Sequence, residues 1–420
     1  PCGVRSQGYA HPNGTAHDPW TDAPPALPKL RGTTFIMISD LSLPLLLLLL
    51  SFSGGVILLA GTRMTALADR IADRTGLGEA LIGGLLLGAA TSLSGTVVSV
   101  TAALDGRASL AFSNAVGGIA AQTAFLAIAD LLYRRANLEH AAAELANVFQ
   151  AGLLMLMLTL PFLAWTSPEA TLFAIHPVSV LLFAIYVVGM YSSHRVREEP
   201  MWEPVDTAET DLDEPDPEDP DPRSTLKLFG VFALLLVLMG VSGWVIAETA
   251  GTLADRYDLR TALVGALMTA VITSMPELVT TLAAVRQGSL QLAVGGIIGG
   301  NTFDVLFLTI SDIAYRPGSL FHAAGSEDYF WLAVGLAMTA VLMLGLIFRQ
   351  RQGPGQIGFE SLTILLIYGA SVAIQALARL QGLVLDDLQQ TVDGQCRHGR
   401  DQGQRPQPQT AAQADGGGQP

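Results

Sequence analysis

The stretch AVITSMPELVT, residues 270–280, places a proline and a glutamate in the middle of a long apolar run. Pro276 has no backbone N–H and clashes with the carbonyl of Ile272, so a helix should kink or break there. The carbonyls near Ile272 and Thr273 then need a partner, either a neighbouring helix or a bound cation. Glu277 follows directly. An ionisable residue at membrane depth indicates a functional site, unless it is a protonated group hydrogen-bonded within the bundle.

A second polar motif lies in the next apolar run, where residues 295–304 read GGIIGGNTFD. Four glycines in six residues allow helices to approach closely. Asn301 and Asp304 follow them at mid-span. Carboxylate, hydroxyl, amide and backbone carbonyl oxygens are the ligands that calcium and sodium prefer. The two motifs together predict a site for a hard cation, and no His/Cys cluster in the sequence indicates zinc or copper.

Both motifs belong to the second copy of an internal repeat. Residues 72–134 align with residues 254–316 without a gap, at an offset of 182, and 23 of 63 positions are identical. Apolar composition does not explain the polar identities, such as Thr91-Ser92 on Thr273-Ser274. The repeat therefore indicates an internal duplication.

The composition is that of a membrane protein. Half of the residues are hydrophobic and 14% are charged, against roughly 25% charged residues in soluble domains. Ten stretches reach the length of about 20 apolar residues that a membrane-spanning helix needs: 42–61, 77–103, 110–133, 141–165, 169–191, 226–247, 259–285, 290–314, 329–348 and 358–380. Five spans in each copy invert the second relative to the first. The sequence thus predicts an all-α membrane protein with ten transmembrane helices as two inverted five-helix repeats.

The remaining segments set the expected domain boundaries. We expect a disordered N-terminal tail at 1–41, the first repeat at 42–191, an acidic cytoplasmic linker at 192–225, the second repeat at 226–380 and a disordered C-terminal tail at 381–420. Twelve basic residues lie in loops after odd-numbered spans and five elsewhere among the loops. This bias predicts that both termini lie outside the cytoplasm. Cys2 and Cys396 lie in opposite tails and indicate no disulfide framework.

The two motifs resemble the signatures of a known transporter family. Residues Thr273 to Glu277 resemble the Gly-Thr-Ser-Leu-Pro-Glu signature of the sodium/calcium exchanger family, within the calcium:cation antiporter superfamily. Residues Gly299 to Asp304 resemble its Gly-Ser-Asn-x-x-Asn/Asp signature. The resemblance covers residues 42–380. It implies that Thr273, Ser274, Glu277 and Asp304 bind ions. The ten spans indicate an integral plasma membrane protein, and the family resemblance implies the bacterial inner membrane.

The first copy departs from the family pattern. Its matching segment reads ATSLSG, residues 90–95, in which Thr91 and Ser92 are kept while Ser94 replaces the proline and Gly95 the glutamate. Its second motif has Gln122 where the family has Asn or Asp. We expect Thr91, Ser92, Gln122 and Asn301 to contribute hydroxyl, carbonyl or amide groups to the site.

The missing glutamate leaves two acids, which carry at most two negative charges. One divalent cation or two monovalent cations would neutralise them, so exchange is expected to be closer to electroneutral than the exchange of three sodium ions for one calcium ion that the family resemblance implies.

The sequence favours a calcium antiporter over three alternative functions. The antiporter would exchange calcium for sodium or protons, with small cations and the lipid bilayer as its partners and no cofactor. A monovalent cation/proton antiporter, and a non-transporting membrane protein with a decayed site, remain open alternatives. The sequence has no P-loop, zincin or Gly-x-Ser-x-Gly pattern, so an enzyme is not expected. Nothing indicates a nucleic-acid partner, and no feature bears on oligomeric state.

Two aspartates near span ends have a more ordinary expected role. Asp130 lies four residues before Arg134, and Asp312 four residues before Arg316. This spacing places each pair on one helix face and predicts local ion pairs at the membrane interface.

Overall fold

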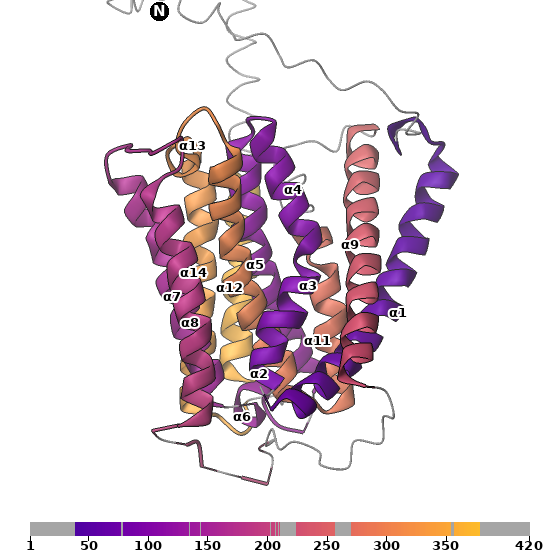
Figure 1. Ribbon diagram of the computed structural model, residues 1–420, viewed down its shortest axis with the longest axis vertical. Helices are drawn as coiled ribbons and strands as arrows, with labels where there is room; N and C mark the ends of the chain where they lie inside the picture. The colour runs from indigo at the N-terminus through magenta and orange to yellow at the C-terminus, as the bar shows by residue number, and fades with distance from the viewer. Residues whose placement is uncertain are drawn as a thin grey trace, which may run out of the picture. The chain divides into compact units, whose positions relative to one another are not determined.

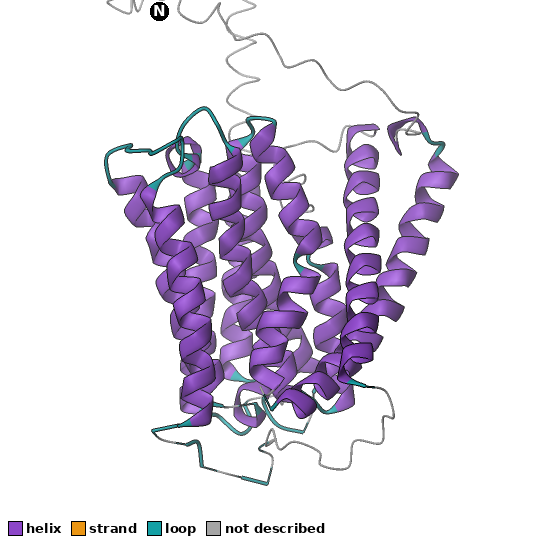
Figure 2. Cartoon of the chain, viewed as in Figure 1, coloured by secondary structure: helices purple, strands orange, loops and turns teal. Residues whose placement is uncertain are grey.

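A computed structural model describes residues 38–378, except 77–78, 134, 143, 202, 206, 209, 211–223, 257–269 and 354–356. The described residues are helical, with one isolated β-bridge between Leu172 and Ile175 (Figure 2). The predicted C-terminal tail, the predicted N-terminal tail before residue 38, and most of the acidic stretch of the predicted linker lie outside the described residues.

Eight described helices are long and apolar enough to cross a membrane. They are α1 (Leu43–Thr75), α5 (Ala108–Leu132), α7 (Leu145–Thr166), α8 (Pro177–Glu198), α9 (Thr225–Arg256), α12 (Leu290–Ala314), α14 (Ser326–Phe348) and the helix Phe359–Ala378. Short helices η1 (Ile38–Asp40), α6 (Leu138–Ala141) and α13 (Leu320–Ala323) flank them. These eight correspond to eight of the ten predicted spans.

The other two predicted spans have a different form. In the second, α2 (Glu79–Ile82), the π-helical η2 (Gly83–Gly88) and α3 (Ala89–Thr91) lead to a bend of 55° before α4 (Leu93–Leu104) (Figure 1). This broken helix can count as a ninth span. In the seventh, α11 (Met275–Gln287) is described, whereas residues 257–269 lie outside the described part of the chain.

Several predicted span boundaries were wrong. Helices α8 and α9 end later than predicted, at Glu198 and Arg256. The span predicted at 169–191 begins eight residues later, because Pro177 occupies the first turn of α8 and His176 caps it by accepting a hydrogen bond from Val178 N. The span predicted at 42–61 continues to Thr75, because the apolar criterion stops at Arg63 while helical residues continue to bury one face through Ala72.

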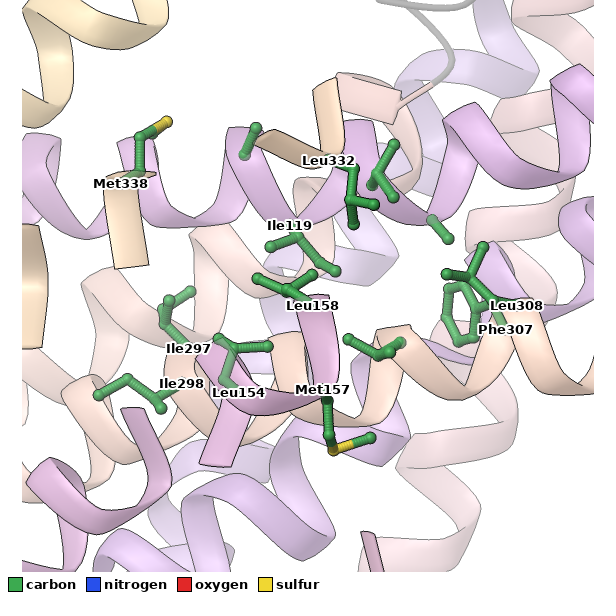
Figure 3. Packing of buried hydrophobic residues seen from close by; sticks show 14 of the residues in the cluster. Ile119, Leu154, Met157, Leu158, Ile297, Ile298, Phe307, Leu308, Leu332 and Met338 are labelled. Atoms are coloured by element: carbon green, nitrogen blue, oxygen red, sulfur yellow. The ribbon is translucent and has the colours of Figure 1, made fainter. Parts of the chain in front are cut away.

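Helices α5 and α12 form the centre of the bundle. In the most apolar stretch of each of these helices 83% of the residues are buried, far more than in the corresponding stretches of α1 or α9. Helix α12 packs against α5, α7, α4 and η2, and α1 packs against α9 and α11 at one side of the bundle (Figure 1). Ile119 of α5, Leu154 and Leu158 of α7, Ile297 of α12 and Leu332 of α14 lie in the central core (Figure 3).

The glycines of the second motif allow the close approach that the sequence predicted. A Cβ atom added to Gly299 would collide with the backbone of Gly84 in η2. One added to Gly88 would lie 2.6 Å from Gly300 Cα. The backbones of η2 and α12 therefore touch, which places the broken helix directly against the centre of the bundle.

Asp130 and Asp312 make matching hydrogen bonds. Asp130 accepts from Leu138 N at 2.7 Å and from Gly358 N at 3.3 Å. Asp312 accepts from Leu320 N at 2.9 Å and from His176 N at 2.7 Å. These donors are counterparts at the offset of 182 that relates the two sequence copies. Leu320 corresponds to Leu138, and Gly358 corresponds to His176.

The predicted ion pair at Asp312 was wrong. Its carboxylate accepts backbone N–H groups and the hydroxyl of Ser179 at 2.6 Å, while Arg316 donates to Phe173 O. Both aspartates are almost fully buried, so backbone donors satisfy them where an interfacial arginine would remain in water. Arg134, the expected partner of Asp130, lies outside the described residues.

Candidate ion-binding site

Two interrupted helices meet at the site. The bend between α3 and α4 lies at Ser92, and α11 begins just after Ser274, the counterpart of Ser92 in the second copy. Pro276 lies in the first turn of α11, as predicted for a break at this proline. The bend at Ser92 has no proline and was not predicted.

One freed carbonyl binds a neighbouring helix. Ser94 Oγ donates to Thr273 O at 3.2 Å, so of the two partners considered for this carbonyl, the neighbouring helix is the one observed. Thr273 Oγ1 donates to Ala270 O at 3.1 Å and approaches Asn114 Oδ1 at 3.4 Å. The polar groups at this break therefore tie α4 and α5 to the start of α11.

The two acids lie in the first turn of α11 and the middle of α12. Glu277 is 3% exposed and Asp304 is 2% exposed. Ser92 Oγ approaches Glu277 Oε1 at 3.5 Å, and Gln122 Nε2 donates to Asp304 Oδ2 at 2.7 Å. Gln122 Nε2 also lies 3.4 Å from Ser274 Oγ. Each acid thus contacts a residue of the first copy.

Three oxygen atoms at the site have no hydrogen-bond partner among the described residues. They are Glu277 Oε2, Asp304 Oδ1 and Gln122 Oε1, and all three are buried. A buried polar atom without a partner loses its hydration and gains nothing in return. These oxygens are therefore available to a cation or a proton.

A small cavity gathers most of the predicted site residues. Its volume is about 10 Å³, and it is lined by Ser92, Gly95, Asn114, Gly118, Gln122, Thr273, Ser274, Glu277, Asp304 and Phe307. That volume accommodates about one water-sized sphere. Six of the predicted residues line it together, so the structure brings them to one place with room for a single dehydrated ion.

Thr91 and Asn301 occupy other positions. Thr91 donates its hydroxyl to Leu87 O and Gly88 O within its own helix. It lines an adjacent cavity, which Glu277 also lines. Asn301 Nδ2 donates to Thr123 Oγ1 at 3.0 Å. Neither side chain lines the cavity that holds both acids.

Two cavity residues were missed by the sequence analysis. Asn114 Nδ2 donates to Gly95 O at 3.0 Å and to Ser99 Oγ at 2.8 Å. Its signal was available, since an asparagine inside an apolar span needs a polar partner. Phe307 gave no signal, because a phenylalanine in an apolar helix is unremarkable in sequence.

Phe307 packs against Gly95, the position at which the family signature has a glutamate. A Cβ atom added to Gly95 would lie 2.8 Å from Phe307 Cε2. The phenyl ring therefore covers the position from which a longer side chain would reach the cavity.

The donors present fit a hard cation. Two carboxyl groups, an amide and hydroxyl groups surround the cavity, and oxygen donors of this kind suit calcium or sodium. Within the described residues, no group of three or more His, Cys, Asp or Glu side chains is placed to hold a metal ion.

Comparison with known proteins gives consistent matches. The family model for "Sodium/calcium exchanger protein" matches residues 45–193 and 227–377. A putative antiporter, CaxA of Alkalimonas amylolytica, is 28% identical over 293 residues, covering 69% of this chain and 87% of CaxA. The inner membrane protein YrbG of Escherichia coli K12 is 32% identical over 123 residues, covering 29% of this chain and 37% of YrbG.

Solved structures of a sodium-calcium exchanger, NCX_Mj, have a similar fold. One, soaked with sodium and without calcium, superposes with a TM-score of 0.59 at 17% identity. The alignment covers 78% of this chain and 98% of NCX_Mj. At this identity the likeness concerns the fold.

Proposed function

The chain belongs to the sodium/calcium exchanger protein family, and from this premise we propose that it is a secondary antiporter that exchanges calcium for sodium or protons. The observation that carries the proposal is the cavity in which Glu277 and Asp304 meet polar groups of the first copy. Unpartnered oxygens of both acids are buried there, so a cation that loses its water can gain protein ligands.

In this proposal Glu277 and Asp304 are the charged ion ligands. Gln122 donates a hydrogen bond to Asp304 Oδ2, which leaves Asp304 Oδ1 free to bind the ion. Ser92, Ser274 and Thr273 supply hydroxyl or carbonyl oxygens from the two helix breaks. Thr91 and Asn301 support the ion ligands without lining the ion cavity. Thr91 lines the neighbouring cavity beside Glu277, and Asn301 lies one turn before Asp304.

Alternating access would come from two inverted five-helix repeats, 42–191 and 226–380, that rock about this site. Three observations support this arrangement. The breaks at Ser92 and Ser274 lie at counterpart positions of the two copies, Gln122 contacts its own counterpart Asp304, and the two buried aspartates make equivalent hydrogen bonds. We also propose the linker 192–225 as cytoplasmic and both termini as external, on the basic residues of the loops.

A monovalent cation/proton antiporter is the second candidate. The observation that favours it is the neutral first copy, where Gly95 has no side chain and Gln122 presents an N–H group to Asp304. A site with two carboxyl groups and a resident donor offers a divalent ion fewer charges than the family signature implies.

The test is calcium uptake into proteoliposomes loaded with sodium, with sodium-free and pH-gradient controls. We expect uptake that requires an outward sodium or proton gradient. Glu277→Gln and Asp304→Asn should reduce it at least about tenfold, since each removes a charged ligand, a loss of about 1.4 kcal/mol or more. Glu203→Gln, at an exposed loop carboxyl, is the matched control.

The outcomes separate the candidates. Sodium or proton fluxes that proceed without any divalent ion, and that the same two substitutions abolish, would favour the monovalent antiporter. Folded wild-type protein with no cation flux under any gradient would contradict both and indicate a membrane protein that does not transport.

A further inference from the structure

A second buried acidic cluster lies at one end of the bundle. Asp130 is near the end of α5, Glu139 is in the short helix α6, and Glu360 is at the start of the helix Phe359–Ala378. They are 1%, 1% and 4% exposed. Three ionised carboxylates cannot share such a place without cations or protons, because each loses its hydration and repels the others.

The side chains of two of these acids pack on the same glycine. A Cβ atom at Gly345, in the last turn of α14, would lie 2.5 Å from Glu360 Cγ and 3.2 Å from Glu139 Cγ. One at Gly358 would lie 3.2 Å from Glu360 Oε2, and Gly358 N itself donates to Asp130. The carboxyl group of Glu360 is therefore directed into the cluster.

The hydrogen bonds distinguish the three acids. Asp130 accepts two backbone N–H groups, which stabilise the ionised form. Glu139 Oε1 accepts from Ser361 Oγ at 3.2 Å. Glu139 Oε2 and Glu360 Oε2 have no partner within the described residues. Two buried, unpartnered carboxyl oxygens in one cluster are the arrangement in which a proton serves as the missing donor.

Neighbouring basic residues contact backbone groups and a hydroxyl group in this region. His140, next to Glu139, bonds Arg349 O and Thr207 Oγ1 with its two ring nitrogens. Arg349 donates to the carbonyls of Val205 and His140, and the carbonyl of Arg351 accepts from Asn137 N. Burial raises the pKa of Glu139 to about 8, and the negative charges of Asp130 and Glu360 contribute further.

The fold itself does not require these acids. The offset between the two copies relates Glu139 to Phe321 and Glu360 to Val178. There the same backbone pattern around Asp312 forms with both positions apolar and buried. The acid pair is therefore an addition at one end of the molecule, which suggests a role beyond packing.

We propose that Glu139, beside Asp130 and Glu360, is a proton-binding site, separate from Glu277 and Asp304, that holds a proton at neutral pH and releases it in the alkaline range. Release adds a buried negative charge between α5, α6, α14 and the helix Phe359–Ala378, which loosens the contact of that helix with α6. The proposal does not depend on transport.

The test is thermal unfolding of the purified full chain as a function of pH. The folded state keeps the Glu139 proton up to about pH 8, whereas the unfolded chain loses it near 4.5. Its stabilisation is thus fully present below about pH 4.5 and is lost as the pH rises to about 8. Wild-type Tm should fall between about pH 5 and 9, while Glu139→Gln, which stays neutral, should fall less and melt above wild type at about pH 9.

Glu360→Gln tests the same site independently and serves if Glu139→Gln does not fold. Glu203→Gln is the control and should follow wild type. In infrared difference spectra between neutral and alkaline pH, the protonated-carboxyl band should weaken in Glu139→Gln and persist in the control. Folded cluster variants that keep the wild-type pH dependence of Tm and the full carboxyl band would overturn the proposal.

Discussion

At the scale of single residues, Gly95 and Phe307 pack against each other in the lining of the candidate ion cavity. The substitution Gly95→Ala adds a Cβ atom 2.8 Å from the phenyl ring, so the ring must move. Overpacking of this kind costs about 1–3 kcal/mol. We expect a lower Tm and slower cation uptake, since both residues line the cavity.

The double variant Gly95→Ala/Phe307→Leu supplies the control. Leucine is smaller than phenylalanine and should relieve the contact, so Tm should recover toward that of Phe307→Leu alone. Gly95→Ala protein with wild-type Tm and uptake would contradict the role assigned to this contact.

The sequence predicted the charged residues of the site better than the neutral ones. Glu277 and Asp304 stand out because acids at membrane depth are costly. The sequence does not show in the same way where a hydroxyl group points. Thr91 and Ser92 are neighbours, yet Thr91 donates to a carbonyl of its own helix while Ser92 lines the cavity that holds both acids. Phe307 was beyond reach, because only the folded backbone brings its ring against Gly95.

At the scale of elements, the approach of η2 to α12 positions the broken helix. We expect Gly299→Ala to disrupt this contact, because its Cβ atom would meet the backbone of Gly84, which cannot move as a side chain can. Ordinary overpacking costs about 1–3 kcal/mol of folding stability, and this substitution should cost at least as much. Thermal unfolding and the yield of monodisperse protein measure it.

Gly54→Ala in α1 is the matched control, since no atom lies within 4 Å of its added Cβ. Alanine is favoured over glycine in a helix interior by roughly 0.5–1 kcal/mol, so this variant should be as stable as wild type or slightly more so. Equal Tm values for the two variants would refute a tight contact at Gly299.

The elements themselves were predictable to different degrees. Apolar length found the positions of the long helices, and Pro276 found the break before α11. The bend at Ser92 was not found, because its causes are tertiary. Ser94 donates to Thr273 O, and Ser92 approaches Glu277, both in the second sequence copy. The glycines of η2 also allow its backbone to pack directly against the backbone of α12, without side chains between them.

At the scale of the whole molecule, the offset between the two copies relates more than sequence identity. Gln122 and Asp304 are counterparts that touch each other, and the counterparts Asp130 and Asp312 each anchor the backbone at a bundle end. The two copies have nevertheless diverged in charge. Carboxylates of the ion site come from the second copy, whereas the first contributes hydroxyls and an amide.

This divergence in charge predicts how transport responds to membrane potential. Glu277 and Asp304 carry at most two negative charges, Phe307 covers the position of Gly95, and Gln122 is neutral. One calcium ion, two sodium ions or two protons each neutralise the site, so exchange of one load for another moves no net charge.

We therefore expect calcium uptake into proteoliposomes to have the same rate whether a potassium diffusion potential makes the interior negative or positive. The driving gradient of sodium or protons is held constant in that measurement, and Glu277→Gln gives the background. Uptake that speeds up with a negative interior, or a net flux whose direction the membrane potential can reverse, would contradict electroneutral exchange while leaving antiport through Glu277 and Asp304 intact.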